Sequence, residues 1–436
     1  MIDPVSLRLF LYNAIILVLG ILILPWVLYQ LAFVKKRRQG LAHRFGRTPV
    51  ADRKTIWCHA VSVGEVRAVS PMLSLLQEDE KARDRIVLST VTVTGQETAN
   101  RECGFVSHIF YFPLDLPFIP KRAVRRVKPE VFITAETEIW PNFFNACFKK
   151  GVPVILVNGR ISDNSYSRYL KFRWFFSPIL QMVSLFLMQS EEDAQRIRNL
   201  GARPETVKMT GNMKYDRVPE PVTLPETVKE WAKGGFLFVA GSTHAGEEEI
   251  VLDAIASLEG LNILLGLVPR HPERFDEVAE LLKAKGVTHT KYTDILSGQA
   301  VNGDVVLVDA MGVLDGFYAL ADVAFVGGSM VPVGGHNLLE PAMHGMPVLT
   351  GPYTHNFRDI TSALLAGGGC TIVADAGSMC EQLTRFSKSK NLRDNMGRAA
   401  RMVSEEASGA SGKNVEMIIQ LLNQGPHAVT EEPLEK

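Results

Sequence analysis

Glu65 lies at the start of a predicted helix, directly after a predicted buried strand, where a carboxylate could take part in proton transfer. Ser62 and Gly64, just before it, suit a tight turn and a helix cap. Because ligands of open α/β sheets bind at the carboxyl ends of strands, Glu65 could act as a general base that accepts a proton from a hydroxyl group. The alternative is an ordinary first-turn glutamate that the helix dipole stabilises.

A glycine-rich segment, residues 324–352, offers groups that could bind an anion. Its sequence, AFVGGSMVPVGGHNLLEPAMHGMPVLTGP, predicts a buried strand, a loop, a helix from residue 337 and a second buried strand. Free backbone N–H groups at the start of that helix favour an anion, so we predict a phosphate site at the turn Gly334-Gly335-His336-Asn337. Glu340 would then accept hydrogen bonds from sugar hydroxyls, such as those of a ribose. Close packing in a doubly wound domain is the alternative reason for these glycines.

Composition limits the classes of function. At 436 residues the chain is long enough for two domains, since single hydrophobic cores stop growing at roughly 250–300 residues. Its 47 Lys and Arg residues balance 47 Asp and Glu residues, so bulk charge gives no reason to expect nucleic acid as a partner. The five cysteines are scattered without a metal-binding spacing, and no Asp-x-Asp follows a predicted strand. We therefore expect reduced thiols of a cytoplasmic protein, no metal ion and no cofactor.

Residues 9–34 carry no charged side chain and predict a membrane anchor, because ~20 apolar residues suffice to cross a hydrocarbon core. The basic cluster Lys35-Lys36-Arg37-Arg38 follows directly, so the positive-inside rule places everything beyond residue 35 in the cytoplasm. A cleavable signal peptide is the alternative, but no small-residue cleavage site follows the apolar stretch. We therefore assign residues 1–38 to a single-pass signal anchor with its basic flank.

Beyond the anchor, short apolar runs alternate with amphipathic segments, which is typical of an α/β protein with doubly wound parallel sheets. A proline-rich segment near residues 217–228 has no buried-strand pattern and predicts a domain boundary, after which the alternation starts again. We therefore predict two Rossmann-like domains, residues 39–220 and 221–425, that face a central cleft. A flexible tail is expected at 426–436.

Long motifs in both predicted domains resemble one family. The first domain contains SVGEVRAVSPML, STVTVTGQETA, AETEIWPN and GNMKYD, and the second contains GSTHAGEEE, VPRHPERF and GGHNLLEPAMHGMPV. This ordered set is similar to the 3-deoxy-D-manno-octulosonic acid (Kdo) transferase family of Gram-negative lipopolysaccharide assembly. The family belongs to the GT-B glycosyltransferases, whose plan is two tandem doubly wound domains, and the resemblance covers essentially the whole chain.

The resemblance implies roles for particular residues. Glu65 matches the proton acceptor of the family, and Glu136 and Lys214 match residues that support the transition state. The implied contacts to the cytidine nucleotide are Pro269, Arg270, Met311, Gly312, Val313, Asn337, Leu338, Leu339 and Glu340. Relatives usually carry Glu at the position of Val313 and Pro at that of Leu338, and contacts made by backbone atoms would tolerate both changes.

The function implied by the resemblance is inverting transfer of Kdo from CMP-Kdo to a lipid A precursor, lipid IVA, with release of CMP. It would occur at the cytoplasmic face of the cell inner membrane. The alternatives are a GT-B transferase or epimerase that uses a UDP-sugar, and a membrane-tethered binding scaffold with a degenerate site. Stabilisation by CMP or CTP rather than UDP would distinguish the donors, and CMP release that is lost in Glu65→Ala would exclude the scaffold.

Other residues keep two interpretations. His244 and His271 follow predicted strands, and they either contact the donor or form hydrogen bonds within their loops. His59 lies within a predicted strand and is interpreted as a structural residue. The basic aromatic stretch at residues 166–175 is either an ordinary amphipathic helix or a surface for a phosphorylated lipid.

Overall fold

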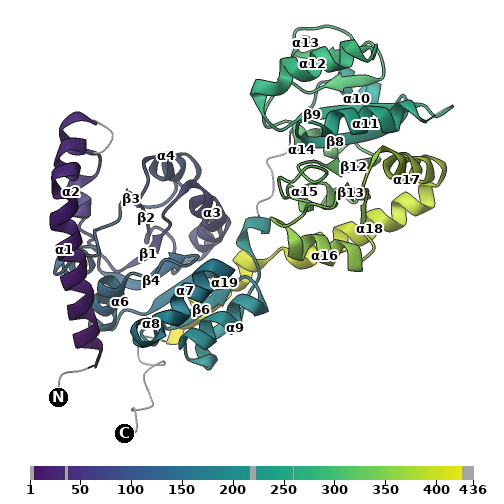
Figure 1. Cartoon of the computed structure of the whole chain (residues 1–436). Helices are drawn as coiled ribbons and strands as arrows, with labels where there is room; N and C mark the ends of the chain where they lie inside the picture. The colour runs from purple at the N-terminus through teal and green to yellow at the C-terminus, as the bar shows by residue number, and fades with distance from the viewer. Residues whose placement is uncertain (1–3, 35–37, 217–221, 259, 425–436) are drawn as a thin grey trace. The chain divides into compact units, whose positions relative to one another are not determined.

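The computed structural model describes residues 4–34, 38–216, 222–258 and 260–424. The chain divides into two compact units: unit 1 comprises residues 1–217 and 408–436, and unit 2 comprises residues 218–407. Each unit is built on one parallel sheet of seven strands (Figure 1). The predicted α/β fold with two doubly wound sheets is therefore confirmed.

The sheet of unit 1 has the strand order β3-β2-β1-β4-β5-β6-β7. Its order reverses between β1 and β4, which pair directly with His59 opposite Thr134. The strands are β1 (Thr55–His59), β2 (Ile86–Thr90), β3 (His108–Tyr111), β4 (Pro129–Ala135), β5 (Val154–Gly159), β6 (Leu185–Met188) and β7 (Val207–Met209).

Helices cover both faces of this sheet, because successive side chains of a strand point to opposite sides. Ile56 and Cys58 of β1 pack with α3, α4 and α19, whereas Trp57 packs with α5, α6, α8 and α9. The helices of unit 1 are α1 (Pro4–Phe33), α2 (Leu41–Arg44), α3 (Val63–Glu78), α4 (Val93–Glu102), α5 (Ile119–Val127), α6 (Pro141–Phe148), α7 (Asp163–Lys171), α8 (Arg173–Leu180), α9 (Glu191–Leu200), the 3-10 turns η2 (Pro204–Thr206) and η3 (Met213–Asp216), and α19 (Ala410–Gln424).

The last helix differs from the sequence-based domain assignment. Residues 221–425 were expected in the second domain, but α19 packs on unit 1, where the chain returns at its yellow end (Figure 1). Ala410 and Ile418 are buried in the same core as Val69 and Leu73 of α3. The apolar face of α3 therefore needs a segment that is distant in sequence. The tail at 426–436 lies outside the described residues.

The sheet of unit 2 has the strand order β10-β11-β9-β8-β12-β13-β14, which reverses between β8 and β12. Its strands are β8 (Phe236–Thr243), β9 (Ile263–Pro269), β10 (His289–Lys291), β11 (Val305–Leu307), β12 (Val323–Val326), β13 (Val348–Thr350) and β14 (Cys370–Ile372). Its helices are α10 (Glu226–Ala232), α11 (Glu247–Ala256), η4 (Pro272–Arg274), α12 (Phe275–Ala284), α13 (Tyr292–Leu296), α14 (Leu314–Tyr318), α15 (Leu339–Ala342), α16 (Arg358–Ala366), α17 (Ala376–Lys388) and α18 (Lys390–Ala407).

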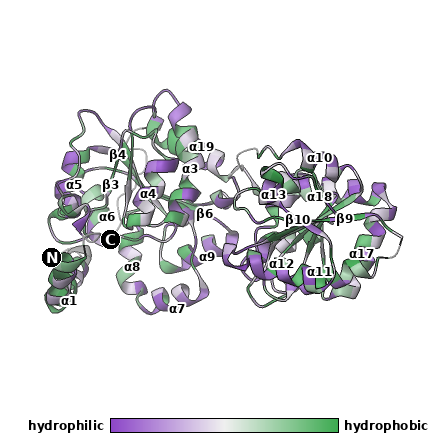
Figure 2. Ribbon diagram, turned by 90° about the horizontal axis from the view of Figure 1, so that it is seen from above, coloured by the Kyte–Doolittle hydropathy of each residue, from purple (hydrophilic) through white to green (hydrophobic). Residues whose placement is uncertain are grey.

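Helix α1 matches the predicted apolar segment. Residues 7–33 are long and apolar enough to cross a membrane, and little of this stretch is buried in the protein. Figure 2 colours α1 mostly green, the colour of hydrophobic residues. Length and composition thus agree with a membrane anchor, although residues 1–3 and 35–37, which include part of the basic flank, lie outside the described residues.

Candidate functional site

Two predicted site residues of unit 1 meet where the strand order reverses. Glu65 follows β1 and Glu136 follows β4, and these two strands are neighbours in the sheet. Ligands of doubly wound sheets bind in the crevice at such a switch point, outside the carboxyl ends of the strands. The topology alone therefore brings these two carboxylates to the place where a ligand is expected.

Glu65 is buried at the N-terminus of α3, with 7% of its surface exposed. Its carboxylate accepts hydrogen bonds from the backbone N–H of Val61 at 2.8 Å and from the Ser62 hydroxyl at 3.0 Å. Ser62 caps the helix by accepting from the Glu65 N–H. Burial raises the pKa of Glu65 and the charge of Glu136 raises it further, while the two hydrogen bonds and the charge of Lys214 lower it.

Lys214 and Glu136 form an ion pair, with 2.7 Å between Nζ and Oε1. Both side chains are partly exposed, so the pair can be reached by a ligand. Glu136 has a left-handed backbone, φ 54°, which is unusual for a residue with a side chain. Its backbone N–H donates to the carbonyl of Val157 on the neighbouring strand, which fixes this turn. The structure thus brings Glu65, Glu136 and Lys214 into one cluster.

The loop that carries Lys214 is held at both ends. Asn158, fully buried at the end of β5, accepts a hydrogen bond from the backbone N–H of Met213 at 3.0 Å. Asp216 accepts from the backbone N–H groups of Gly409 and Ser411, just before and at the start of α19. Asn158 and Asp216 therefore position the lysine.

A third carboxylate, Glu138, belongs to the same cluster. Burial raises its pKa to about 7, and the charges of Glu65 and Glu136 contribute to this rise. No role was predicted for Glu138 from the sequence, although it lies within one of the family motifs. The spacing Glu-x-Glu at the end of a buried strand was the available signal for a second carboxylate at this place.

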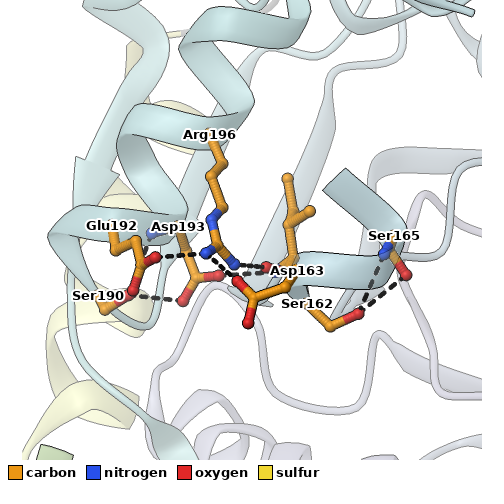
Figure 3. A network of polar contacts seen from close by, with 8 residues as sticks. Ser162, Asp163, Ser165, Ser190, Glu192, Asp193 and Arg196 are labelled. Carbon is orange, nitrogen blue, oxygen red and sulfur yellow. Dashed lines mark hydrogen bonds and ion pairs between the residues drawn. The ribbon is translucent and has the colours of Figure 1, made fainter. Parts of the chain in front are cut away.

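The capping geometry of Glu65 recurs at Asp193 in α9, which gives an internal comparison. Asp193 accepts from the Ser190 hydroxyl at 2.6 Å and from the backbone N–H of Ile161 at 2.7 Å. Figure 3 shows that Arg196 lies beside Asp193 and pairs with Asp163 and Glu192. Arg196 thus pairs with the two carboxylates beside Asp193, whereas the Glu65 cluster has one cation, Lys214, for the three carboxylates Glu65, Glu136 and Glu138.

In unit 2, Glu247 organises the loop that follows β12. It is fully buried, and it accepts hydrogen bonds from the backbone N–H groups of Gly328 at 2.7 Å, Ser329 at 2.9 Å and Met330 at 2.8 Å. It also accepts from the backbone N–H of His244 at 2.9 Å, so it ties the loop after β8 to the loop after β12. This residue was not predicted from the sequence, because a glutamate in the first turn of a helix has an ordinary explanation.

Groups that can carry positive charge gather beside these loops. The Nε2 atoms of His244 and His336 are 2.8 Å apart, and the ring of His271 lies 5.1 Å from that of His244. Burial, together with the charges of His244, Arg270 and His271, lowers the pKa of His336 to about 4. A site in which cations repel one another is suited to an anion, and Arg270 supplies a permanent charge there.

The short helix predicted from residue 337 begins two residues later in the structure. α15 begins at Leu339 and ends at Ala342, so its dipole is that of one turn. The N–H groups of Gly334 and Gly335 donate to the carbonyl of Gly328, at 3.1 and 2.7 Å. The turn Gly334-Gly335-His336-Asn337 therefore precedes the helix, the N–H groups of its two glycines are used within the loop, and a phosphate site at this turn stays a prediction.

The other predicted donor residues fall into two groups. Pro269 ends β9, with Arg270 directly after it and exposed. Met311, Gly312 and Val313 form the turn before α14, where Met311 is exposed and Gly312 has φ 84°.

The residues around α15 form the second group. Asn337 accepts from the Leu339 N–H at 3.1 Å, and Leu338 and Leu339 are buried. Burial raises the pKa of Tyr318, and the charge of the nearby Glu340 raises it further. The buried side chains of Leu338 and Leu339 leave their backbone atoms as the groups for contact with a ligand. Among the described residues, no group of three or more His, Cys, Asp or Glu is placed to hold a metal ion.

Comparisons with known proteins identify the family and the fold. Residues 39–217 match the family described as 3-Deoxy-D-manno-octulosonic-acid transferase (kdotransferase). The 3-deoxy-D-manno-octulosonic acid transferase of Haemophilus influenzae is 35% identical over 94% of this chain and 97% of its own length. The enzyme of the same name from Bordetella pertussis is 32% identical over 86% of this chain and 90% of its own length. A crystal structure of UDP-N-acetylglucosamine 2-epimerase has a TM-score of 0.58, with 13% identity over 88% of this chain and 100% of that one.

Two tandem doubly wound units place the chain in the GT-B class, a fold it shares with the epimerase. The two transferases with similar sequences identify the family within this class, because each match covers most of this chain and at least 90% of the relative. The chain belongs to the 3-deoxy-D-manno-octulosonic acid (Kdo) transferase family and is a glycosyltransferase.

Proposed function

We infer that the protein transfers Kdo from CMP-Kdo to a lipid A precursor, lipid IVA, during lipopolysaccharide biosynthesis, and releases CMP. The observation that carries this proposal is the cluster of Glu65, Glu136 and Lys214 at the switch point of the first sheet, in a chain of the Kdo transferase family. The three residues to which the family resemblance gives a catalytic role thus lie close together within unit 1.

Glu65 is proposed as the proton acceptor. An acceptor hydroxyl attacks the anomeric carbon of Kdo, the bond from that carbon to the phosphate oxygen breaks, and its electron pair leaves with CMP. The hydroxyl proton passes to Glu65. The raised pKa of Glu65 makes its carboxylate a stronger base, provided that the working pH keeps it ionised. A single displacement of this kind inverts the anomeric configuration.

Glu136 and Lys214 are proposed to support the transition state. The ammonium of Lys214 is held 2.7 Å from Glu136 and is partly exposed, so it can face negative charge that develops on a ligand. The same ammonium lowers the pKa of Glu65, which helps to keep that carboxylate ionised.

Unit 2 is proposed to bind the donor. CMP-Kdo carries a phosphate and a carboxylate, and the cluster of Arg270, His244, His271 and His336 offers donors for such anions. The nucleotide contacts proposed from the family are Pro269, Arg270, Met311, Gly312, Val313, Asn337, Leu338, Leu339 and Glu340. The Nε2 atoms of His244 and His336 are within hydrogen-bond distance at 2.8 Å, and the pair can take up a proton when an anion binds, because the anion offsets the repulsion between the charged groups.

The acceptor side of unit 1 is proposed to lie along α7 and α8. A cavity of about 280 Å³ is lined by Ser165, Arg168, Tyr169, Phe172 and Phe176, which combine one cation with aromatic rings. Burial raises the pKa of the Tyr169 phenol and the charge of Glu138 raises it further, which indicates that the cavity lies near the carboxylate cluster. Such a cavity fits an acceptor that has both phosphate and apolar parts. The apolar α1 would keep the enzyme at the inner membrane, on its cytoplasmic side.

The reaction is tested with purified protein, CMP-Kdo and lipid IVA, followed by mass spectrometry of the lipid product. We expect the acceptor mass to increase by one or more Kdo residues, with CMP released in equal amount. A protein that leaves CMP-Kdo intact but is stabilised by UDP, and consumes a UDP-sugar, would contradict the proposal.

A further inference from the structure

Two polar side chains near the start of α1 hold this helix against unit 1. Tyr12 Oη donates to Asp115 Oδ2 at 3.0 Å, and Asn142 Nδ2 donates to Asn13 Oδ1 at 2.7 Å. Asp115 is 7% exposed and also accepts from the backbone N–H groups of Asn142 at 3.1 Å and Phe143 at 2.8 Å. We call Tyr12, Asn13, Asp115 and Asn142 the clasp.

The clasp lies on one narrow face of α1, and most of the remaining helix is apolar and exposed. Exposed fractions reach 69% at Ile21, 70% at Leu22 and 73% at Phe33. Leu9 is buried, and partly buried positions continue along the same helical face at Tyr12, Asn13, Ile16, Gly20, Val27 and Gln30. A soluble surface does not leave so large an apolar area uncovered, and lipid acyl chains fit a surface of this composition.

The clasp and a membrane crossing by α1 exclude each other. A rise of about 1.5 Å per residue separates Tyr12 from Phe33 by about 32 Å along the helix. The hydrocarbon core of a bilayer is about 30 Å thick. In a crossing helix, Tyr12 would therefore lie at the opposite membrane face from the chain that follows Phe33. Asp115 and Asn142 belong to the chain that follows Phe33, so they could not form hydrogen bonds with Tyr12 and Asn13 across the membrane.

We propose that α1 lies along the membrane surface, with its exposed apolar side among the acyl chains and both of its ends on the same side as unit 1. This inference rests on the membrane location proposed above, and it replaces the single-pass crossing that the sequence predicted. In this arrangement the clasp, rather than a linker, holds unit 1 at the lipid surface.

Apolar side chains beside the clasp extend the lipid-facing surface. Phe118, in the loop that carries Asp115, is 86% exposed, and Trp174 of α8 is 53% exposed. The neighbouring Phe175 contacts the ring of Tyr12, with 5.9 Å between centroids. Aromatic side chains are favoured at the level of lipid headgroups. Unit 1 would thus meet the membrane along α1, the Asp115 loop and α8, where a lipid acceptor can approach sideways.

The test locates the N-terminus by labelling with a membrane-impermeant maleimide. A cysteine is placed in a short glycine-serine extension before Met1, and a second reporter is Ser74→Cys on the exposed side of α3. Four of the native cysteines are buried, and the partly exposed Cys380 is changed to Ser in both proteins. We expect neither reporter to label in intact spheroplasts and both to label after lysis. An N-terminal cysteine that labels in intact spheroplasts would overturn the proposal.

The clasp is tested by the double variant Tyr12→Phe with Asn13→Leu, which removes its polar groups from α1 and leaves an apolar helix. We expect labelling of the N-terminal cysteine in intact spheroplasts to increase at least several-fold, because the freed helix can cross. Tyr29→Phe is the matched control, since Tyr29 is 58% exposed on the same helix and should change nothing. A double variant whose N-terminus stays protected would show that the clasp does not set the arrangement.

Two further measurements distinguish a lipid-covered α1 from one covered by a second copy of the chain. Alkaline carbonate extraction should leave the protein in the membrane pellet, whereas release as a dimer would mean that a second copy covers α1 and would contradict the inference. CMP release from CMP-Kdo is measured in the same samples. Loss of that activity together with an internal N-terminus would contradict the proposed reaction and leave the helix arrangement supported.

Discussion

Replacing Glu65 with Gln separates its role as a helix cap from its role as a proton acceptor. The glutamine amide keeps the shape of the side chain but has only one acceptor oxygen. It therefore cannot replace both carboxylate oxygens, which accept from the Val61 N–H and from the Ser62 hydroxyl. Losing one such capping interaction costs about 1 kcal/mol of stability. A general base contributes roughly 10²–10⁴-fold to a rate. That factor corresponds to about 3–5 kcal/mol of transition-state stabilisation.

Asp193→Asn supplies the matched control. Asp193 accepts from an N-cap serine and from a backbone N–H in the same way, and it is 8% exposed where Glu65 is 7% exposed. Both variants should therefore lower the unfolding temperature by similar amounts. Asp193→Asn should keep kcat within about threefold, whereas Glu65→Gln should lower kcat by roughly 10²–10⁴-fold.

The assay is CMP release at saturating CMP-Kdo and lipid IVA, measured beside thermal unfolding of the same samples. CMP binding to each variant shows whether the donor site is intact, and we expect it to be unchanged. If Glu65→Gln retained wild-type kcat, or if both variants lost kcat in proportion to their stability, Glu65 would be a cap and the assignment as proton acceptor would fail.

Four other outcomes are expected. Lys214→Met should lower kcat and move the acid limb of the kcat/KM profile to higher pH, because the lost ammonium no longer lowers the pKa of Glu65, which must be ionised to act; an unmoved limb would contradict this coupling. His336→Gln should weaken CMP binding ~10-fold by calorimetry, while the control His289→Gln on the edge strand β10 should not. Burial lowers the pKa of His59 to about 3 in the folded protein, whereas the unfolded residue gains a proton below about pH 6.5. The unfolded state therefore binds more protons, and the free energy of unfolding decreases as the pH is lowered from 7 to 5. Wild type should therefore lose about 2 kcal/mol more than His59→Gln between pH 7 and pH 5 in urea unfolding, and equal losses would refute this. Ile418→Ala, at a fully buried position of α19, should cost about 2–5 kcal/mol in the unfolding of unit 1; a loss below 1 kcal/mol would mean that α19 adds little to that core.

The buried strands were predictable because they are continuous apolar runs that end in turns. The central strands β1, β4, β8 and β9 each contain at least three consecutive apolar residues. The strands β7, β10 and β14 were missed, since each has three residues, lies at a sheet edge and is partly exposed. Short edge strands owe their conformation to pairing with a neighbour, which local sequence does not encode.

The site was predictable to the extent that topology brings strand ends together. Glu65 and Glu136 follow strands that pair with each other, so the alternation of strands and helices predicts that the two residues lie close together. The ion pair between Lys214 and Glu136 depends on Asn158, which lies far from both in sequence and has no local motif. The helix predicted from residue 337 begins at Leu339, because the N–H groups of Gly334 and Gly335 bind the carbonyl of Gly328 and keep the preceding residues in a loop.

Helix α19 belongs to unit 1 but follows unit 2 in the chain, so it is synthesised long after the rest of unit 1. The ribosome makes it only after all of unit 2, and at about 5–20 residues per second this delay is roughly 10–40 s. During that time the nascent first unit lacks Ala410 and Ile418 in its core, and Asp216 lacks the N–H groups of Gly409 and Ser411. The lysine loop therefore gains its final support only when the chain is nearly finished, and a prematurely terminated product would lack a fully assembled centre.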